Sequence, residues 1–345
     1  MKGKMKAGIL SAPKTYSIQE IDIPAVAEDS VLLQVAHCGI CGTDLHFYQV
    51  NYISSCPNGH EISGRVVEIG KNVTGFKEGD RVAVEINVYC GKCSYCLSGN
   101  YNLCKNYQWI GGPTLPGGNA EYVCVPSYTL HHLPDSLSLE EGALVEPLAV
   151  AVHAAGLAEI NPGSSVAILG SGTIGLTTLL AARAYGARRV FISAKYEHQA
   201  LLAEKLGADH VIRLGQENLQ EKMMSLTDDE AVDITFNTAS TAESFHDACK
   251  ITRRKGKIVL LALFTTGPVT LRFPWEATIT SSFIYGAQGL RRDYEIAIDL
   301  IASGKVDVKS LVTHRFPLDE IQRAYHTALD KNTKSIKVLV CPQLK

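Results

Sequence analysis

A glycine-rich turn between a short apolar run and a helical segment limits the folds that this chain can adopt. The apolar run Val166–Leu169 has the character of a buried strand, and a helix is expected over Ile174–Tyr185. Between them stands Gly-Ser-Gly-Thr-Ile-Gly. Its first glycine permits a tight turn, its second lets the backbone approach a pyrophosphate, and its third lets helix and strand pack closely. A diphosphate would lie on the positive helix N-terminus, so the turn predicts a dinucleotide site. The predicted cofactor-binding residues of this turn are Gly170, Gly172, Thr173, Ile174 and Gly175.

The next expected strand, Arg189–Ser193, bears on the choice between NAD and NADP. An NAD enzyme places an acidic residue about 20 positions after the loop, where it binds the ribose hydroxyls. That position here is Ala194, and Lys195 follows it. A missing carboxylate and a nearby cation favour the 2′-phosphate of NADP. The alternative is that Lys195 is a solvated loop residue and Glu197 binds the ribose, so NAD stays open.

The pattern of strands and helices divides the chain into two domains. The first part, to about residue 155, contains short β-like runs broken by glycine and proline, which is typical of a mainly antiparallel, barrel-like domain. After Asn161-Pro162-Gly163, apolar strands alternate with helical stretches, which indicates an α/β domain with a doubly wound parallel sheet. The expected elements are Val31–Ala36, Gly64–Ile69, Arg81–Ile86 and Ala120–Pro126 in the first part, and Val166–Leu169, Ile174–Tyr185, Arg189–Ser193, Gln199–Leu206, His210–Ile212, Asp233–Asn237, Ala242–Ile251 and Lys257–Leu263 in the second.

The tail of the chain contains a helix at Tyr294–Ser303, an extended segment, a helix at Leu318–Asp330 and a strand at Ile336–Val340. A sheet already closed by its own helices does not need these elements, so we expect the tail to return to the first domain. The predicted catalytic domain is therefore 1–155 with 294–345, and the inserted dinucleotide domain is 156–293.

Four cysteines, Cys90, Cys93, Cys96 and Cys104, follow the spacing C-x2-C-x2-C-x7-C. Four thiolates so close in sequence can close a tetrahedral shell around zinc, and a closed shell leaves no position for substrate, so this site should be structural. An iron–sulfur cluster is disfavoured, because the ferredoxin run spaces its fourth cysteine closer and follows it with proline, whereas Lys105 follows here. Free cysteines without a metal are the remaining alternative.

A second set of metal-ligating residue types stands in Cys38–His46 and in Gly59-His60-Glu61. Cysteine, histidine and glutamate are good zinc ligands, and three protein ligands leave a position for substrate or water. Glu146 lies in a strongly apolar stretch, where a carboxylate is costly unless it meets a cation. Singly, each residue more often has a structural role. Together with the dinucleotide loop they predict a catalytic zinc site.

Composition excludes several other classes of function. The formal net charge of the 345 residues is −2, which gives no basis for binding nucleic acid or an anionic membrane. The least polar stretch, Gly142–Ala158, contains a glutamate, a proline and a histidine and is no membrane span. The start of the chain lacks the apolar region of a signal peptide. We therefore expect a cytoplasmic protein with reduced cysteines and a small-molecule partner.

The chain resembles the zinc-containing medium-chain dehydrogenase/reductase family, and within it the sorbitol (polyol) dehydrogenase branch. The resemblance spans nearly the whole chain. It implies a GroES-like, mainly-β catalytic domain with an inserted Rossmann domain, and a homo-oligomer, dimeric or tetrameric. Beside the cysteine loop and the glycine loop, the matching stretches are Cys38–His46, Gly59–Val73, Gly79–Val82, Gly117–Tyr122, Leu144–Ala154 and Leu311–Pro317.

The family pattern assigns ligands to the catalytic zinc. Carried over residue by residue, it makes Cys41, rather than Cys38, one ligand and His60 the second. Glu61 and Glu146 are the remaining carboxylates. The resemblance leaves open which of them binds the metal directly.

The resemblance also assigns groups around that zinc and a reaction. Asp44 matches the carboxylate that orients the zinc-bound histidine. Thr43 and His46 match positions that relay a proton to solvent. Two zinc ions per chain are implied, one catalytic and one structural. The implied reaction is hydride transfer between a secondary alcohol (a polyol, a sugar alcohol or its phosphate, or a diol) or its ketone and NAD or NADP.

Other functions stay open at this point. Threonine or another amino alcohol is an alternative substrate, although the aromatic stretch expected for it after His46 is missing. The zinc ligands disfavour a zinc-free quinone or enone reductase of the same fold. The pair Thr43 and His46 disfavours a non-catalytic cofactor-binding protein, because a binder needs no proton path.

The chain departs from the polyol branch at residues 284–292, where the expected Arg-Tyr pair is absent. Arg291 and Arg292 stand there instead, and guanidinium groups suit a phosphate or carboxylate of the substrate. The alternative is a solvated pair at a helix start. Cys56, close in sequence to His60, is expected to be a small buried or rim residue rather than a ligand.

Overall fold

The computed structural model describes residues 2–50, 52–239, 241–262 and 274–344. The chain divides into two compact units, one of Met1–Glu146 with Val308–Lys345 and one of Pro147–Asp307. The second unit is therefore inserted into the first, and the last part of the chain belongs with its beginning. None of the helices in the described ranges is both long and apolar enough to cross a lipid bilayer.

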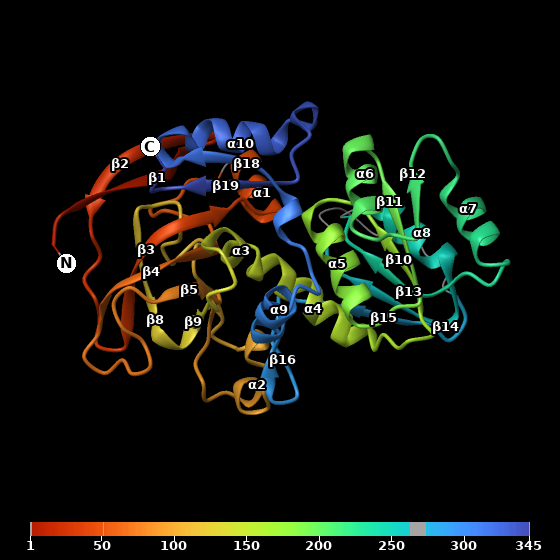
Figure 1. The fold of residues 1–345 in the computed structure, drawn as a ribbon, viewed down its shortest axis with the longest axis horizontal. Helices are drawn as coiled ribbons and strands as arrows, with labels where there is room; N and C mark the ends of the chain where they lie inside the picture. Colours follow the sequence, from red (N-terminus) through yellow and green to blue (C-terminus); the bar gives the residue numbers. More distant parts are fainter. Residues whose placement is uncertain (1, 51, 240, 263–273, 345) are drawn as a thin grey trace. The chain divides into compact units, whose positions relative to one another are not determined.

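The first unit is mainly β-structure (Figure 1). Its elements are β1 (Lys4–Ala12), β2 (Thr15–Asp22), β3 (Ser30–Gly39), α1 (Gly42–Gln49), β4 (Glu61–Ile69), β5 (Arg81–Val84), β6 (Asn87–Val88), α2 (Ser94–Leu97), β7 (Gln108–Trp109), β8 (Tyr122–Pro126), β9 (Leu130–His132), α3 (Leu139–Ala143), β18 (Val312–Pro317), α10 (Ile321–Leu329) and β19 (Lys337–Cys341), with 3₁₀ turns at Tyr101–Leu103, Ser127–Thr129, Lys309–Leu311, Leu318–Glu320 and Lys331–Thr333.

One sheet joins the beginning of the chain to its tail in this unit. Its strand order is β18-β19-β3-β4-β5-β9, with β8 also paired to β3. The pairing of β19 with β3 is antiparallel and places Val340 opposite Cys38. The tail from residue 308 onward thus supplies strands to the first unit. A strand edge left at β3 would expose unpaired backbone groups, and β19 covers it.

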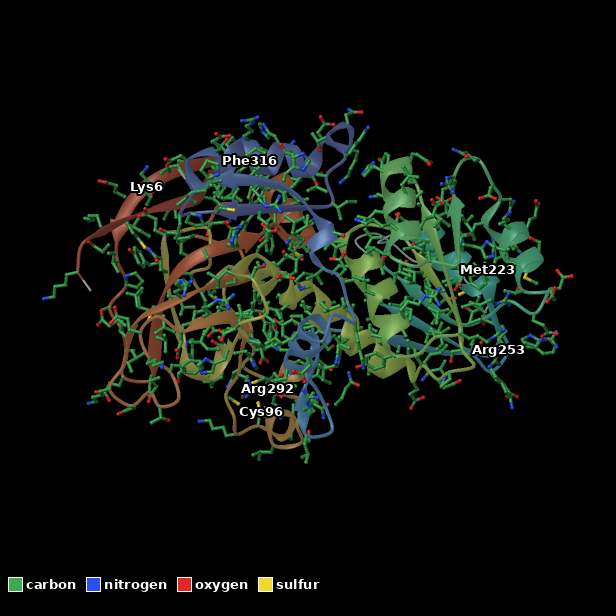
Figure 2. All side chains as sticks on the ribbon, in the orientation of Figure 1. Lys6, Cys96, Met223, Arg253, Arg292 and Phe316 are labelled. Atoms are coloured by element: carbon green, nitrogen blue, oxygen red, sulfur yellow. The ribbon has the colours of Figure 1, made fainter. Side chains whose placement is uncertain are left out.

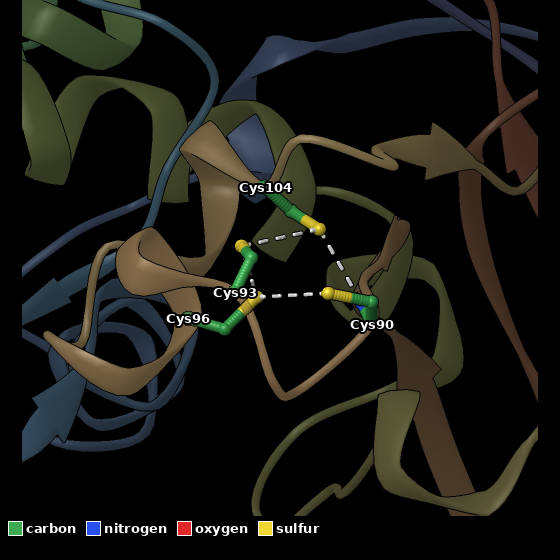
Figure 3. Close-up of side chains that lie close together, drawn as sticks. All are labelled: Cys90, Cys93, Cys96 and Cys104. Carbon is green, nitrogen blue, oxygen red and sulfur yellow. Dashed lines mark hydrogen bonds between the residues drawn. The ribbon is translucent and has the colours of Figure 1, made fainter.

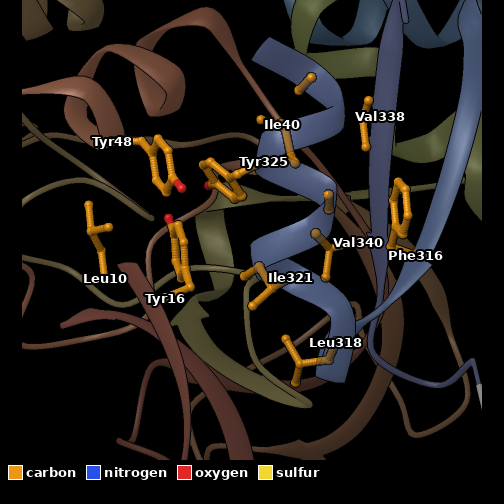
Figure 4. Packing of buried hydrophobic residues seen from close by; sticks show 12 residues of the cluster. Leu10, Tyr16, Ile40, Tyr48, Phe316, Leu318, Ile321, Tyr325, Val338 and Val340 are labelled. Carbon is orange, nitrogen blue, oxygen red and sulfur yellow. The ribbon is translucent and has the colours of Figure 1, made fainter. Parts of the chain in front are cut away.

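Helix α10 packs on the same unit through a cluster of three tyrosines (Figure 4). The rings of Tyr16 and Tyr325 have centroids 4.4 Å apart, and those of Tyr48 and Tyr325 are 5.4 Å apart. Because tyrosine hydroxyls need partners when buried, this core is polar at its centre. Tyr16 donates to Asn58 Oδ1 at 2.7 Å, and Asn119 Nδ2 donates to the hydroxyl of Tyr325 at 3.2 Å.

The second unit is a doubly wound α/β domain (Figure 1). Its elements are α4 (Val145–Ala158), whose first two residues precede the division, β10 (Ser165–Leu169), α5 (Thr173–Ala184), β11 (Arg189–Ala194), α6 (Glu197–Lys205), β12 (His210–Arg213), α7 (Leu219–Leu226), β13 (Val232–Asn237), α8 (Ala242–Ile251), β14 (Thr252–Leu260), β15 (Thr278–Ser281), β16 (Ala287–Gln288), β17 (Arg291–Arg292) and α9 (Asp293–Ala302).

The parallel sheet has the strand order β12-β11-β10-β13-β14-β15. Since parallel crossovers are right-handed, the reversal of order at β10 and β13 places the helices that follow them on opposite faces. Met223 of α7, labelled in Figure 2, belongs to a buried hydrophobic cluster that also contains Phe245 of α8 and Val232 of β13. Helix α8 spans the predicted residues, whereas α1, α7 and β15 were not predicted. The predicted strand end Leu263 lies outside the described residues.

The unit boundaries differ from the predicted ones at 155 and 294, because α4 and α9 are tied together inside the second unit. Asp293 is fully buried, and its Oδ2 lies 2.7 Å from Nδ1 of His153 on α4. The amide of Gly286 donates to the same oxygen at 2.8 Å, and Gln288 Nε2 donates to Oδ1 at 2.7 Å. Helix α9 therefore stays with the dinucleotide unit, and the tail joins the first unit only after it.

Replacing Asp293 by alanine should lower the free energy of unfolding by about 3–5 kcal/mol, because several buried donors lose a shared acceptor. Urea titration followed by circular dichroism measures this loss. Asp299 lies on the same helix but is 62% exposed, so Asp299→Ala should leave the free energy of unfolding nearly unchanged. Equal losses in the two variants would contradict the role given to Asp293.

Candidate active site and cofactor site

The four cysteines between β6 and β7 converge on one point (Figure 3). The Sγ atoms of Cys93 and Cys96 are 3.5 Å apart, and those of Cys90 and Cys96 and of Cys93 and Cys104 are 4.0 Å apart. Four sulfurs about 2.3 Å from a tetrahedral zinc ion would be about 3.8 Å from one another. The observed spacing therefore fits a zinc ion among four sulfurs.

Backbone amides prepare this loop for a metal. The amides of Cys90 and Asn106 both donate to Cys104 Sγ at 3.3 Å. Backbone hydrogen bonds lower the pKa of Cys93 to about 6, while burial raises the pKa of Cys96 to about 12. A thiolate is the form that binds zinc, and a divalent cation would stabilise it at all four positions.

The start of α1 gathers residues from the first predicted set. Cys41 precedes the helix, and its backbone amide donates to Asp44 Oδ2 at 2.9 Å. Asp44 is 1% exposed, whereas Thr43 and His46 are exposed. Thr43 and His46 are three positions apart on the helix, so they lie on one face of it.

His60 stands directly before β4 and is buried. Its Nδ1 lies 3.5 Å from Asp44 Oδ1, and neither atom has a hydrogen-bond partner within the part of the chain that the structure describes. Burial lowers the pKa of His60, but the Asp44 carboxylate and the Cys41 thiol raise it above its ordinary value. That Asp44 orients an imidazole whose other nitrogen binds a metal stays a prediction.

Glu61 is held by a lysine that the sequence analysis did not single out. Lys337, the first residue of β19, donates from Nζ to both carboxylate oxygens of Glu61 at 2.6 Å and to the carbonyl of Ile40 at 3.0 Å. Both side chains are 1% exposed. Burial alone would lower the pKa of Lys337, but Glu61 raises it above its ordinary value, so the lysine stays charged.

Sheet register places this ion pair. Gly39 of β3 lies opposite both Glu61 of β4 and Leu339 of β19. A Cβ at Gly39 would lie 1.8 Å from Glu61 Oε2, so only glycine leaves room for the carboxylate. The sequence does indicate that Lys337 is unusual, because a lysine stands directly before the apolar run Val-Leu-Val. That its partner is Glu61 follows only from the pairing of the strands.

Glu146 is another buried carboxylate of this unit, with 4% exposure. Burial raises its pKa to about 7, and the charge of His60 partly offsets that rise. Among the described residues its carboxylate has no hydrogen-bond partner. Because an unpaired buried carboxylate is costly, this position calls for a cation.

The residues of this set fit a catalytic zinc by their chemistry. Cys41, His60 and Glu146 offer a thiolate, an imidazole and a carboxylate, which leaves one coordination position open. The set is looser than the cysteine loop, which is the one group among the described residues with all ligand atoms within 4.8 Å. Cys38 is buried in β3, and Cys56 Sγ lies 3.9 Å from Ser54 Oγ.

The glycine loop of the second unit has the geometry that its sequence predicts. Gly170 has φ +100° and donates from its amide to Ser193 Oγ at 3.0 Å. A Cβ at Gly175 would lie 1.9 Å from the carbonyl oxygen of Gly170. A Cβ at Gly172 would meet no atom within 4 Å. The N-terminus of α5 at Thr173 is therefore accessible. The loop stands where the strand order reverses, which is where such sheets bind dinucleotides.

The end of β11 carries no carboxylate. Ala194 ends this strand and is buried, and Lys195 after it is exposed. Glu197, the other residue considered for the ribose, accepts hydrogen bonds on both carboxylate oxygens from Arg213, at 3.0 and 3.2 Å. Its carboxylate is therefore already engaged.

Arg291 and Arg292 lie on β17, ahead of α9. Arg291 donates to Asp299 Oδ2 at 2.5 Å, and its side chain is 54% exposed. The backbone amide of Arg292 donates to Glu295 Oε2 at 3.2 Å. A role of Arg291 and Arg292 in binding the substrate stays a prediction.

Comparison with known proteins identifies the family of this chain. Residues 27–135 match the alcohol dehydrogenase GroES-like domain, and residues 173–303 match the zinc-binding dehydrogenase domain. Sorbitol dehydrogenase of Bacillus subtilis (strain 168) is 36% identical, over 98% of this chain and 97% of that protein. The chain belongs to the zinc-containing medium-chain dehydrogenases.

This dehydrogenase is also similar to D-arabitol-phosphate dehydrogenase of Enterococcus avium, at 34% identity over 99% of this chain and 98% of that protein. A Sinorhizobium meliloti 1021 protein, described as a zinc-binding dehydrogenase bound to NADP, matches with a TM-score of 0.90 and 32% identity, covering 99% and 100% of the two chains. The predicted GroES-like and Rossmann fold and the resemblance to polyol dehydrogenases are thereby confirmed.

The two cysteine sites should respond differently to mutation. Cys41→Ala should lose one zinc ion per chain and at least about a hundredfold in kcat, because a Lewis acid contributes several kcal/mol to the barrier. Cys90→Ala should also lose one zinc ion, but mainly at the expense of thermal stability. Mass spectrometry of bound zinc, thermal unfolding and kcat measured on both variants test this. Full turnover by zinc-deficient Cys41→Ala would refute the assignment.

Lys337→Met should lower the free energy of unfolding by about 3–5 kcal/mol, because it leaves the Glu61 carboxylate buried without a counter-charge. The double variant Lys337→Met with Glu61→Gln should recover most of that loss. Lys6→Met is the surface control, since the partner of Lys6, Asp319, is 59% exposed, and it should leave the unfolding midpoint nearly unchanged. A double variant no more stable than Lys337→Met would show that charge is not the cause.

Proposed function

We propose that this dehydrogenase transfers a hydride between a secondary alcohol of a polyol, sugar alcohol or diol and NADP. The observation that carries the proposal is the buried carboxylate of Glu146, which the charges of His60 and Lys337 attract, in the same unit as Cys41 and His60. Such a set needs a cation, and the family to which the chain belongs uses zinc. The glycine loop of the other unit supports a dinucleotide as the redox partner.

The chain's own residues take distinct roles in this proposal. Cys41, His60 and Glu146 would hold the catalytic zinc, and Glu61 stays bound to Lys337 beside them. When bound, zinc supplies Lewis-acid activation of a hydroxyl, and the nicotinamide supplies the hydride acceptor.

Two exposed residues of α1 handle the proton. The Thr43 hydroxyl would accept the substrate proton while it releases its own proton toward His46, on the same helix face, which passes a proton to solvent. Asp44 fixes the ring of His60 and takes no proton itself. A second zinc ion in the cysteine loop would be purely structural, because four sulfurs leave no coordination position open.

Three features support NADP over NAD. Ala194 offers no carboxylate to the ribose, Lys195 is an exposed cation next to it, and Glu197 is occupied by Arg213. A 2′-phosphate would therefore meet one free positive charge and no free carboxylate at the end of β11.

The relatives act on polyols and their phosphates, as their names state, and this supports a substrate with neighbouring hydroxyl groups. Arg291 and Arg292 would suit a phosphate or carboxylate on such a substrate. Arg291 would first have to exchange its ion pair with Asp299, which is exposed and therefore weak.

We also propose a homo-oligomer, dimeric or tetrameric, that works in the cytoplasm. Among the described strands, β15 ends the parallel sheet, and its outer backbone groups suit pairing with a second copy. None of the ten cysteines, all of which the structure describes, forms a disulfide, which suits a reducing compartment.

A substrate panel tests the reaction directly. Absorbance of reduced cofactor would be followed with sorbitol, xylitol, ribitol, 2,3-butanediol, threonine and sugar-alcohol phosphates, each with NADP and NAD. We expect turnover with a polyol or diol, faster with NADP and abolished by chelation of zinc. Turnover that survives complete removal of zinc, or oxidation of threonine alone, would overturn the proposal.

A further inference from the structure

Arg213 lies beside the position that decides the cofactor in this fold. The parallel register of β11 and β12 places Ala194 opposite Arg213 at the carboxyl ends of the two strands. Ala194 occupies the place where NAD enzymes carry the acid that binds ribose. Helix α6 begins three residues later at Glu197, so the arginine and this glutamate meet next to the adenosine end of the site.

The contact between them fixes the carboxylate. Arg213 donates from Nε to Oε2 of Glu197 at 3.0 Å and from a terminal nitrogen to Oε1 at 3.2 Å. The same terminal nitrogen donates to Glu204 Oε1 at 2.9 Å. Glu197 and Glu204 lie two helical turns apart on one face of α6. The guanidinium group of Arg213 therefore lies between two carboxylates and is bound by both. A planar guanidinium with two parallel bonds sets the direction of a carboxylate more tightly than a single charge does.

The other charged groups nearby do not replace this contact. The Lys195 ammonium lies 5.9 Å from the ring centroid of Tyr196 and forms no ion pair with a described residue. Glu217 accepts from the backbone amide of Arg213 and pairs with Lys222. The bond from Arg213 holds the pKa of Glu197 below its ordinary value, so this carboxylate is charged at neutral pH.

A charged glutamate at the start of α6 would act against NADP if it were free. Its oxygens would accept hydrogen bonds from the ribose hydroxyls of NAD, and its charge would repel a 2′-phosphate. We propose that Arg213 is a positioning residue for cofactor choice, which favours NADP by holding Glu197 away from the ribose. This inference rests on the proposed preference for NADP and adds a residue that acts through another side chain.

The test measures binding of reduced cofactors to the full-length, zinc-loaded protein. Fluorescence titration gives Kd for NADPH and NADH without turnover. Arg213→Leu should lower the preference for NADPH over NADH by about threefold to tenfold, because it releases one negative charge beside the phosphate. The double variant Arg213→Leu with Glu197→Gln should restore the preference, since the released group is then neutral.

Glu204→Gln is the matched control. It removes an ion pair from the same arginine but leaves both bonds to Glu197, so the preference should not change. Circular dichroism checks that every variant is folded, and Arg213→Gln takes the place of Arg213→Leu if the leucine variant is not.

The possible outcomes distinguish the role of Arg213 from the proposed preference for NADP on which it rests. Wild-type protein that binds NADH more tightly than NADPH would overturn the proposed cofactor. An unchanged preference in Arg213→Leu would overturn only the role of Arg213. A lowered preference that Glu197→Gln does not restore would also overturn it, because Arg213 would then contact the phosphate itself.

Discussion

The ion pair between Lys337 and Glu61 is buried, with both side chains 1% exposed, and it joins the two ends of the first unit. Removing two charges from water is costly, and their attraction offsets that cost only when the geometry is close and the remaining polar atoms are satisfied. Here Lys337 bonds to both oxygens of the carboxylate and to the carbonyl of Ile40. Lys337 begins β19, which pairs with β3, so the carboxylate next to His60 is neutralised from the last described strand of the chain.

This ion pair also separates the two glutamates near the predicted catalytic zinc. Glu61 forms an ion pair with Lys337, whereas Glu146, which is 4% exposed, is attracted by the charges of His60 and Lys337 but forms no ion pair or hydrogen bond with a described residue. The two glutamates therefore differ in whether the protein itself supplies a counter-charge at hydrogen-bonding distance. The one without a partner gains most from a metal ion, which is the physical basis for placing it in the zinc shell.

The C-terminal part of the chain also contacts the residues that fix the segment before His60. Tyr16 and Asn119 both donate to Asn58 Oδ1, two residues before His60, and Asn119 also reaches the hydroxyl of Tyr325 on α10. A tyrosine cluster that is satisfied by amides is stiffer than an apolar core, because each hydroxyl has a fixed direction. The tail thus supports the zinc-binding segment through packing as well as through charge.

Much of this protein could be predicted from local sequence. The roles of Gly170 and Gly175 depend on backbone geometry within one turn, and the cysteine loop closes on itself within a short stretch, so spacing alone predicts both. Local patterns suffice in these cases because the interacting atoms are separated by few bonds. The roles of Cys41 and Asp44 were predicted differently: they came from the resemblance to the family, because helix α1, at whose start both lie, was not predicted.

The tertiary structure decided what depends on register between strands and on packing between distant segments. Lys337 is separated from Glu61 by most of the chain, and Arg213 reaches Glu197 from a neighbouring strand. The unit boundaries differ from the predicted ones because His153 and Asp293, each unremarkable in its own segment, share a partly buried hydrogen bond. A buried charge acquires its role from the one group that neutralises it, and the fold alone determines which group that is.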